Sequence, residues 1–249
     1  MSRADHFWQL SCFDELPSTS DYCLDVCRAG HGAAGQAVLA YRQTKGRGSR
    51  GRNWLDAGQG LALSVVLDAS HAGSDALGGW PFVASLGFYD GLLRAVPAAS
   101  SRLMIKWPND ILLDGQKMGG ILIEREGDFV LIGLGANLVS APQQSMVERP
   151  VACLAQCGCV PDVKTVAQHV LDGLAWWQLE WQQKGFASVR SAWLEGAQPL
   201  GTPLVVKGGT TYEEGHFAGL AEDGRLLLSM ENGMKTIATG DILLMEKGA

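Results

Sequence analysis

The chain has 249 residues, 47% of them hydrophobic and 18% charged, with a net charge of −6. This length suits one large domain, or a main domain with a small one, and it can bury a sizeable core. The composition excludes long disordered stretches. The acidic balance argues against nucleic acid as the main partner, because phosphate binding needs a basic face, so we expect no binding to DNA.

The N-terminal residues Met1–His6 lead into a short apolar stretch without a signal-peptide pattern. The longest apolar run, 78–96, is interrupted by Asp90 and Arg94 and is too polar for a membrane span. The six cysteines show no paired CxxC spacing, which favours reduced thiols over a metal site. We therefore expect a cytoplasmic protein without a membrane partner.

The first half of the chain alternates strands and helices. Hydroxyls at 18–20 are typical of a helix N-cap, and Gly30 ends that helix; Pro81 opens a second helix. The segment 43–53 holds three glycines and no apolar residue, which predicts a loop. Strands are expected at 7–13, 37–41, 61–67, 103–106, 111–113, 119–124 and 129–138, and helices at 18–30, 81–96, 162–174 and 186–194.

These elements predict an α+β fold, with a mixed or antiparallel sheet and helices packed on one side. After Pro199 the pattern changes to short strands separated by Gly-Gly, Asp-Gly and Asn-Gly turns, at 204–206, 211–220, 226–229, 235–238 and 242–245. That pattern predicts a small antiparallel barrel. We place the boundary near 196–202, which gives domains 1–198 and 199–249.

The most distinctive motif is the segment from Gly46 to Trp54, GRGSRGRNW. Glycines let the backbone approach a ligand and offer N–H groups to an anion, and arginines supply forked donors for phosphate or carboxylate oxygens. The segment is not a phosphate loop of the GxxxxGKS type. A solvated basic loop without a ligand is the alternative interpretation.

A second cluster runs from Lys106 to Asp110 (KWPND) and from Lys117 to Gly120 (KMGG). Two lysines, an amide and a carboxylate near a glycine-rich anion loop indicate a site that holds several negative charges. Asp110 is a candidate Mg²⁺ ligand, or it caps the turn. Two further segments complete the set: the hydroxyls 18–20, as N-cap or as contacts to a polar head group, and Gly133–Asn137 (GLGAN) at a strand end.

The order STS, QTKGRGSRGRNW, KWPNDIL, KMGGILIE and GLGANL resembles the catalytic domain of biotin–protein ligases, over about Leu16 to Leu138. The resemblance implies a class II synthetase-like mixed sheet with helices on one side, followed by a small SH3-like β-barrel. It implies ATP and Mg²⁺ as co-substrate and ion, and biotin as the substrate. The implied reaction makes biotinyl-5′-AMP and passes biotin to a lysine of a biotin carboxyl carrier protein, of acetyl-CoA carboxylase or a related carboxylase.

The resemblance also implies roles for single residues. Lys117 and Arg47 are the expected catalytic residues, and Asp110 is the expected Mg²⁺ ligand. The expected biotin contacts are Ser18, Thr19, Ser20, Gln43, Gly46, Arg47, Gly48, Ser49, Lys117 and Gly120. The expected ATP contacts are Arg50, Arg52, Trp54, Lys106, Asn109 and Asn137.

The chain departs from the family pattern in two places. Ser49 stands where several members have an additional arginine in the loop, which predicts weaker retention of the adenylate. Only about 15 residues precede the STS motif, too few for a helix-turn-helix domain, so we expect a short form that is a ligase and not a repressor. The sequence leaves the oligomeric state open, a homodimer included.

Two alternatives remain at this stage. A lipoate-type ligase or acyltransferase shares the fold, but the STS and KWPND segments speak against it. A non-catalytic binding module or biotin sensor is disfavoured by the acidic charge and by the absence of a DNA-binding segment.

Overall fold

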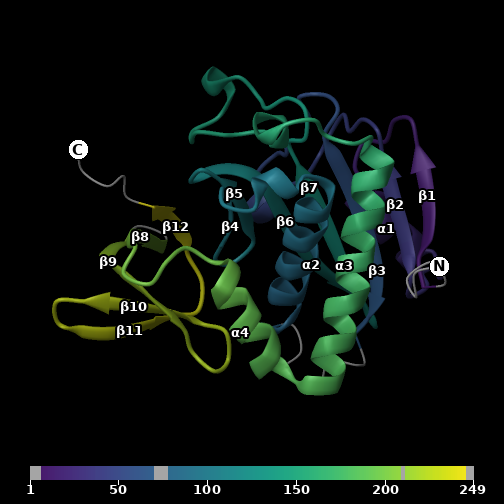
Figure 1. Ribbon diagram of the computed structural model, residues 1–249. Helices are drawn as coiled ribbons and strands as arrows, with labels where there is room; N and C mark the ends of the chain where they lie inside the picture. Colours follow the sequence, from purple (N-terminus) through teal and green to yellow (C-terminus); the bar gives the residue numbers. More distant parts are fainter. Residues whose placement is uncertain (1–6, 70–77, 209–210, 245–249) are drawn as a thin grey trace.

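The protein is described by a computed structural model that covers residues 7–69, 78–208 and 211–244 (Figure 1). In these residues one seven-stranded sheet has the order β1-β2-β3-β7-β6-β5-β4. Its first two strands pair in parallel and the others are antiparallel, so the expected mixed sheet is confirmed. The strands are β1 (Gln9–Phe13), β2 (Gln36–Ala40), β3 (Leu61–Asp68), β4 (Leu103–Lys106), β5 (Asp110–Leu113), β6 (Gln116–Glu126) and β7 (Phe129–Ala136).

Three helices cover one face of this sheet: α2 (Trp80–Ala95), α3 (Val163–Lys184) and α4 (Phe186–Gly196) (Figure 1). The N-cap of α3 is Asp162, as the sequence predicted. Gly87 and Gly91 of α2 let the helix axes approach closely, because a Cβ at Gly87 would lie 2.7 Å from the backbone nitrogen of Leu174. Side chains such as Leu39, Leu63 and Ile132 fill the core between the sheet and these helices.

The fourth helix, α1 (Thr19–Arg28), packs on the opposite face of the sheet. Its Cys23 and Leu24 contact Val38, Val66 and Leu131, which alternate along their strands with the residues that face α2 and α3. The expectation that all helices lie on one side is therefore wrong for α1. Thr19 and Ser20, at the N-terminus of α1, line a pocket on this face.

The C-terminal strands form a second sheet, called here the C-terminal sheet, in the order β11-β10-β9-β8-β12. All five were expected, and only Met245, at the end of the last one, lies outside the described residues. In the part of the chain described, no pairing joins β11 to β12, so hydrogen bonds do not close the barrel. The strands are β8 (Pro203–Gly208), β9 (Thr211–Leu220), β10 (Leu226–Met230), β11 (Gly233–Ile237) and β12 (Asp241–Leu244).

The two sheets share one hydrophobic core. Leu204 and Phe217 of the C-terminal sheet belong to the same buried cluster as Phe82 of α2. The indole nitrogen of Trp107 donates to the carbonyl of Gly224 at 3.1 Å, and Arg190 donates to the carbonyl of Ala221 at 2.9 Å. The C-terminal sheet is thus fixed against the end of the main sheet that carries β4, while the division at 198/199 stays a prediction.

Short 3₁₀ turns lie at Ser49–Gly51, Pro97–Ala99, Gln144–Met146 and Leu154–Cys157. Among the residues described, no helix is both long enough and apolar enough to cross a membrane. The N-terminal residues Met1–His6, where no signal peptide was expected, lie outside the described chain.

Candidate active site

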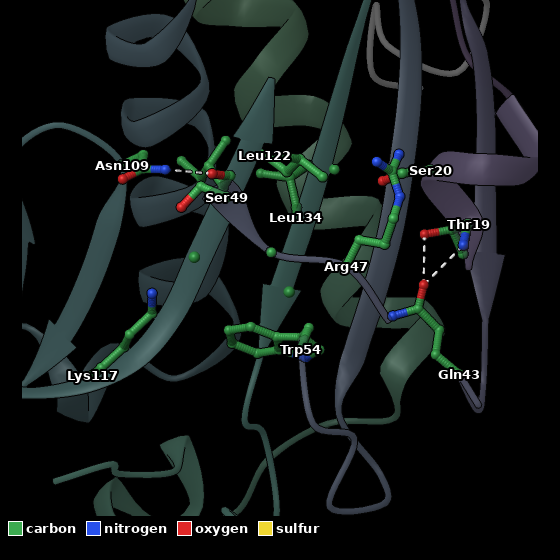
Figure 2. Close-up of a pocket in the computed structure, with 15 residues that line it drawn as sticks. Thr19, Ser20, Gln43, Arg47, Ser49, Trp54, Asn109, Lys117, Leu122 and Leu134 are labelled. Atoms are coloured by element: carbon green, nitrogen blue, oxygen red, sulfur yellow. Dashed lines mark hydrogen bonds between the residues drawn. The ribbon is translucent and has the colours of Figure 1, made fainter. Parts of the chain in front are cut away.

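A pocket opens on the face of the sheet that carries α1 (Figure 2). Helix α1 and the segment from Gly46 to Trp54, called here the glycine–arginine loop, form its walls, and β6 and β7 form its floor. In Figure 2, Lys117 and Gln43 lie on opposite sides of Trp54. The lining residues are Thr19, Ser20, Gln43, Arg47, Gly48, Ser49, Trp54, Asn109, Lys117, Gly120, Ile121, Leu122, Gly133, Leu134 and Gly135.

Glycines make up part of the floor of the pocket, beside Ile121, Leu122 and Leu134. Gly133 and Gly135 of β7 face the pocket, and Gly120 of β6 pairs with Gly135. A Cβ at Gly133 would lie 2.5 Å from Ser20 Oγ, and one at Gly135 would lie 2.8 Å from the Trp54 ring. Only glycine fits there, because the helix end and the indole ring lie directly on the backbone.

One end of the pocket is lined with hydroxyls and an amide. The Gln43 side-chain oxygen accepts from the Thr19 backbone N–H at 2.8 Å and from its hydroxyl at 3.1 Å. Ser64 of β3 donates to Thr19 Oγ1 at 2.8 Å and lies 3.1 Å from Ser20 Oγ. Thr19, Ser20 and Gln43 line the pocket and can bind a polar ring that both donates and accepts hydrogen bonds, whereas Ser64 is fully buried behind them.

Two of these positions differ from expectation. Ser64 was missed, although a lone hydroxyl inside the apolar run LALSVVLD is a visible signal. Ser18 caps α1, where its hydroxyl accepts from the Asp21 N–H at 3.2 Å, and it is not among the lining residues. This hydrogen bond confirms the interpretation of Ser18 as an N-cap, whereas its role as a biotin contact stays a prediction.

The glycine–arginine loop is held at its start by Arg47. The guanidinium binds both oxygens of Glu124 on β6, at 2.9 and 2.5 Å, and its Nε lies 2.7 Å from Asp21 of α1. The hydrogen bond to Glu124 raises the pKa of Arg47. The N–H of Trp54 donates to the Gly46 carbonyl at 2.9 Å and closes the loop. Sequence reasoning found the arginine but neither of its acidic partners.

At the other end of the pocket, Asp110 lies between two lysines. Its oxygens are 2.8 Å from Lys106 Nζ and 2.6 Å from Lys117 Nζ. Burial by itself would raise the pKa of Asp110, but the two ammonium groups outweigh burial and lower this pKa from 3.8 to about 2. Burial lowers the pKa of Lys106 more than the attraction of Asp110 raises it. The three residues, called here the lysine–aspartate triad, carry a net charge of +1 beside the pocket.

Asp110 does not fit the role of a Mg²⁺ ligand, because both oxygens of its carboxylate already bind ammonium groups. Among the residues described, no group of three or more histidine, cysteine or acidic side chains is placed to hold a metal ion. Mg²⁺ usually keeps several waters and binds substrate phosphates, so it does not require such a group. A metal at this site would therefore be held mainly by its nucleotide.

The two predicted asparagines bind backbone groups. Asn109 donates to the Ile121 carbonyl at 2.7 Å and lines the pocket. Asn137 is buried outside the pocket and donates to the Ala152 carbonyl at 3.0 Å, and the Ala152 N–H donates to the Lys117 carbonyl at 3.0 Å. Asn137 therefore supports the strand of Lys117, and its role as an ATP contact stays a prediction.

Arg50 and Arg52 point away from the pocket lining and toward β12, where both approach Asp241. A second cleft of about 630 Å³ adjoins the pocket. Lys106 and Lys117 line it on one side, and residues 198–203 with the end of β12 line it on the other. The two cavities share Lys117, so an anion bound there is accessible from both.

Comparison with known proteins agrees with this arrangement. Residues 12–137 match the model of the Biotin/lipoate A/B protein ligase family, and residues 204–245 match that of the Biotin protein ligase C terminal domain. A biotin–[acetyl-CoA-carboxylase] ligase of Paracoccus denitrificans is 36% identical over 238 residues, which cover 91% of this chain and 98% of that protein. The bifunctional ligase/repressor BirA of Escherichia coli (strain K12) is 29% identical, over 92% of this chain and 72% of that protein.

A solved structure, the biotin protein ligase from Aquifex aeolicus in complex with biotin and ATP, superposes with a TM-score of 0.84. It is 27% identical and covers 96% of this chain and 99% of that chain. The fold, the order of the motifs and the extent of these matches agree, and the chain belongs to the biotin/lipoate A/B protein ligase family.

Proposed function

We propose that this protein is an ATP-dependent biotin–protein ligase, which makes biotinyl-5′-AMP and transfers biotin to a lysine of a carboxylase carrier protein. The observation that carries the proposal is the polarity of the pocket. A hydroxyl–amide network at Thr19 and Gln43 suits the ureido ring, and a triad with a net positive charge at Lys117 suits a carboxylate. The ligands of the Paracoccus and Aquifex relatives, as their names give them, support the same substrates.

The first half-reaction joins two anions. A biotin carboxylate oxygen attacks the α-phosphorus of ATP, the bond to the β-phosphate breaks, and pyrophosphate leaves. Positive charge must reduce the repulsion between carboxylate and phosphate and stabilise the charge that builds up. We assign this role to Lys117, with Arg47 closing the glycine–arginine loop over the ligand. Trp54 and the loop would exclude water from the mixed anhydride.

In the second half-reaction the neutral amine of the acceptor lysine attacks the acyl carbon, AMP leaves, and the amine loses a proton. The acceptor needs a path to the pocket, and the cleft that shares Lys117 offers one. We infer that the acceptor is the biotin carboxyl carrier protein of acetyl-CoA carboxylase or a related carboxylase. We further propose that the protein works in the cytoplasm and that Mg²⁺ is supplied with ATP. A division into domains at 198/199 and a homodimer are also proposals.

The test is biotin-dependent exchange of pyrophosphate into ATP by the purified protein, with lipoate as the control acid. Exchange with biotin alone supports the proposal. Exchange with lipoate alone would assign the protein to the lipoate ligases, and no exchange with either acid would favour a binding module.

A variant pair sharpens this test. Lys117→Ala should abolish exchange while leaving the circular dichroism spectrum unchanged. Lys164→Ala, on α3 and remote from the pocket, is the matched control. Near-normal exchange by Lys117→Ala would show that our assignment of this lysine is wrong.

A further inference from the structure

The first residue of β12 contacts the glycine–arginine loop from the far end of the chain. Asp241 Oδ1 lies 3.1 Å from Arg50 Nη1 and 3.5 Å from Arg52 Nη2. Arg50 also reaches Thr239 Oγ1, at 3.4 Å and 189 residues along the sequence. The loop is therefore attached to the C-terminal sheet as well as to α1 and β6.

The next residue of the same strand contacts the other half of the site. The carbonyl of Ile242 accepts from Lys106 Nζ at 3.1 Å, and Lys106 in turn binds Asp110. Adjacent residues of β12 thus connect to the loop and to the lysine–aspartate triad. The C-terminal sheet fixes the distance between the two cationic parts of the site.

The loop is arranged to present its arginines to Asp241. Arg50 has φ 59° and ψ 35°, a left-handed conformation that a residue other than glycine adopts only when its surroundings hold it there. Arg52 donates to the carbonyl of Ser49 at 3.2 Å and to its hydroxyl at 3.0 Å, which turns the guanidinium toward β12. Serine at position 49 thus orients Arg52.

We propose that Asp241 is a positioning residue that holds the glycine–arginine loop closed over the adenylate; this inference rests on the proposed function. One carboxylate faces two guanidinium groups, so a net charge of +1 remains on the loop to attract an anion. The triphosphate of ATP, with its larger negative charge, competes with Asp241 for the arginines. Once pyrophosphate has left, the single charge of the adenylate cannot occupy both arginines, and the loop returns to Asp241.

The consequence is a closed state that lasts until the acceptor arrives. In this chain the C-terminal sheet contributes to retention of the intermediate, a task for which the loop lacks an additional arginine at position 49. The arginine–aspartate contacts are about half exposed on the arginine side, so they are individually weak and sensitive to salt.

The test compares Asp241→Asn, Asp241→Glu and the control Asp223→Asn. Asp223 lies in the turn between β9 and β10 of the C-terminal sheet and pairs locally with Arg225. Amide hydrogen exchange of residues 46–54 is measured first, in the ligand-free protein. Exchange in Asp241→Asn should be about fivefold faster than in the wild type, as expected for the loss of weak exposed ion pairs. Asp241→Glu and Asp223→Asn should exchange like the wild type, and equal rates in all four proteins would overturn the proposal.

The second readout is the release of preformed biotinyl-adenylate, which should also be about fivefold faster in Asp241→Asn, with the KM for biotin unchanged. If the wild type forms no adenylate, the proposed function fails, while the amide hydrogen exchange rates still test whether Asp241 holds the loop closed. If adenylate forms and is released from the wild type and from Asp241→Asn at the same rate, the proposed role of Asp241 is wrong and the proposed function stands. Should Asp241→Asn not fold, raising the salt concentration must accelerate exchange of the wild-type loop, and no acceleration would overturn the proposal.

Discussion

The lysine–aspartate triad allows a stability prediction that separates two roles of Asp110. Replacing Asp110 by Asn keeps the shape of the side chain but removes the charge that faces Lys106 and Lys117. Lys106 is the more affected partner, because its side chain is only 8% exposed, whereas that of Lys117 is 33% exposed and can be solvated. Leaving one buried charge without its partner costs about 3–5 kcal/mol.

The lower end of that range applies here. Lys106 still donates to the carbonyl of Ile242, which partly compensates the charge that loses its counter-ion. We therefore expect the free energy of unfolding to fall by about 3 kcal/mol. At about 2–4 °C per kcal/mol for a chain of this size, the melting temperature should fall by roughly 6–12 °C.

The assay is urea unfolding at neutral pH, followed by tryptophan fluorescence. The matched control is Asp114→Asn, four residues along the same hairpin, where the carboxylate is half exposed and pairs with Arg102. Asn tolerates the positive φ of 50° at this position, so the control should unfold almost like the wild type. If Asp110→Asn were no less stable than Asp114→Asn but lost the pyrophosphate-exchange activity, the role of Asp110 as a counter-ion would be refuted. A metal-binding role for Asp110 would then regain support.

Three further predictions follow from the same contacts. The pKa of Asp110 is lowered to about 2, so the stability that its charge gives the folded state is complete above about pH 4 and is lost as the pH falls through 2. In urea titrations, the difference in unfolding free energy between wild type and Asp110→Asn should therefore stay constant from about pH 5 to 7 and shrink in acid. Gly133→Ala should weaken biotin binding at least about tenfold, measured by calorimetry, because the new Cβ would lie 2.5 Å from Ser20 Oγ. The control Gly78→Ala, whose Cβ meets open space, should bind biotin normally, and equal affinities of the two variants would contradict the place of Gly133 in the pocket floor. Ser49→Arg, which keeps the backbone carbonyl that accepts from Arg52, should slow adenylate release, and release at the wild-type rate would show that an additional arginine in the loop does not retain the intermediate.

Local rules were sufficient for most of the secondary structure. A hydroxyl before a helix, a proline at its first turn, glycine-rich turns and period-two alternation act over a few residues, so they place both ends of α1 and α2, the start of α3 and the strands closely. The expected end of α3 at residue 174 is wrong, because the helix continues to Lys184. The same holds for the site motifs. The KWPND and KMGG segments flank one hairpin, and strand pairing there brings Lys117 beside Asp110.

The side-chain partners within the site could not be read in this way. Arg47 was recognisable from its glycine neighbours, but its partner Glu124 is one of several acids near the end of β6. The sequence likewise gave no sign that the amide of Asn137 donates to the carbonyl of Ala152. A polar residue has many candidate partners in a chain, and only the order of the strands selects one.

The sequence by itself determined the alternation of helices and strands, the family resemblance and the motifs that supply most of the pocket lining, because these depend on composition and short-range spacing. The tertiary structure alone decided that α1 lies on the face opposite the other helices, which opens the pocket, and that β12 reaches the loop and the triad together. The reason is physical. Which face a helix covers and which strands lie side by side depend on burial of the whole core, a balance over residues far apart in the chain that no local pattern encodes.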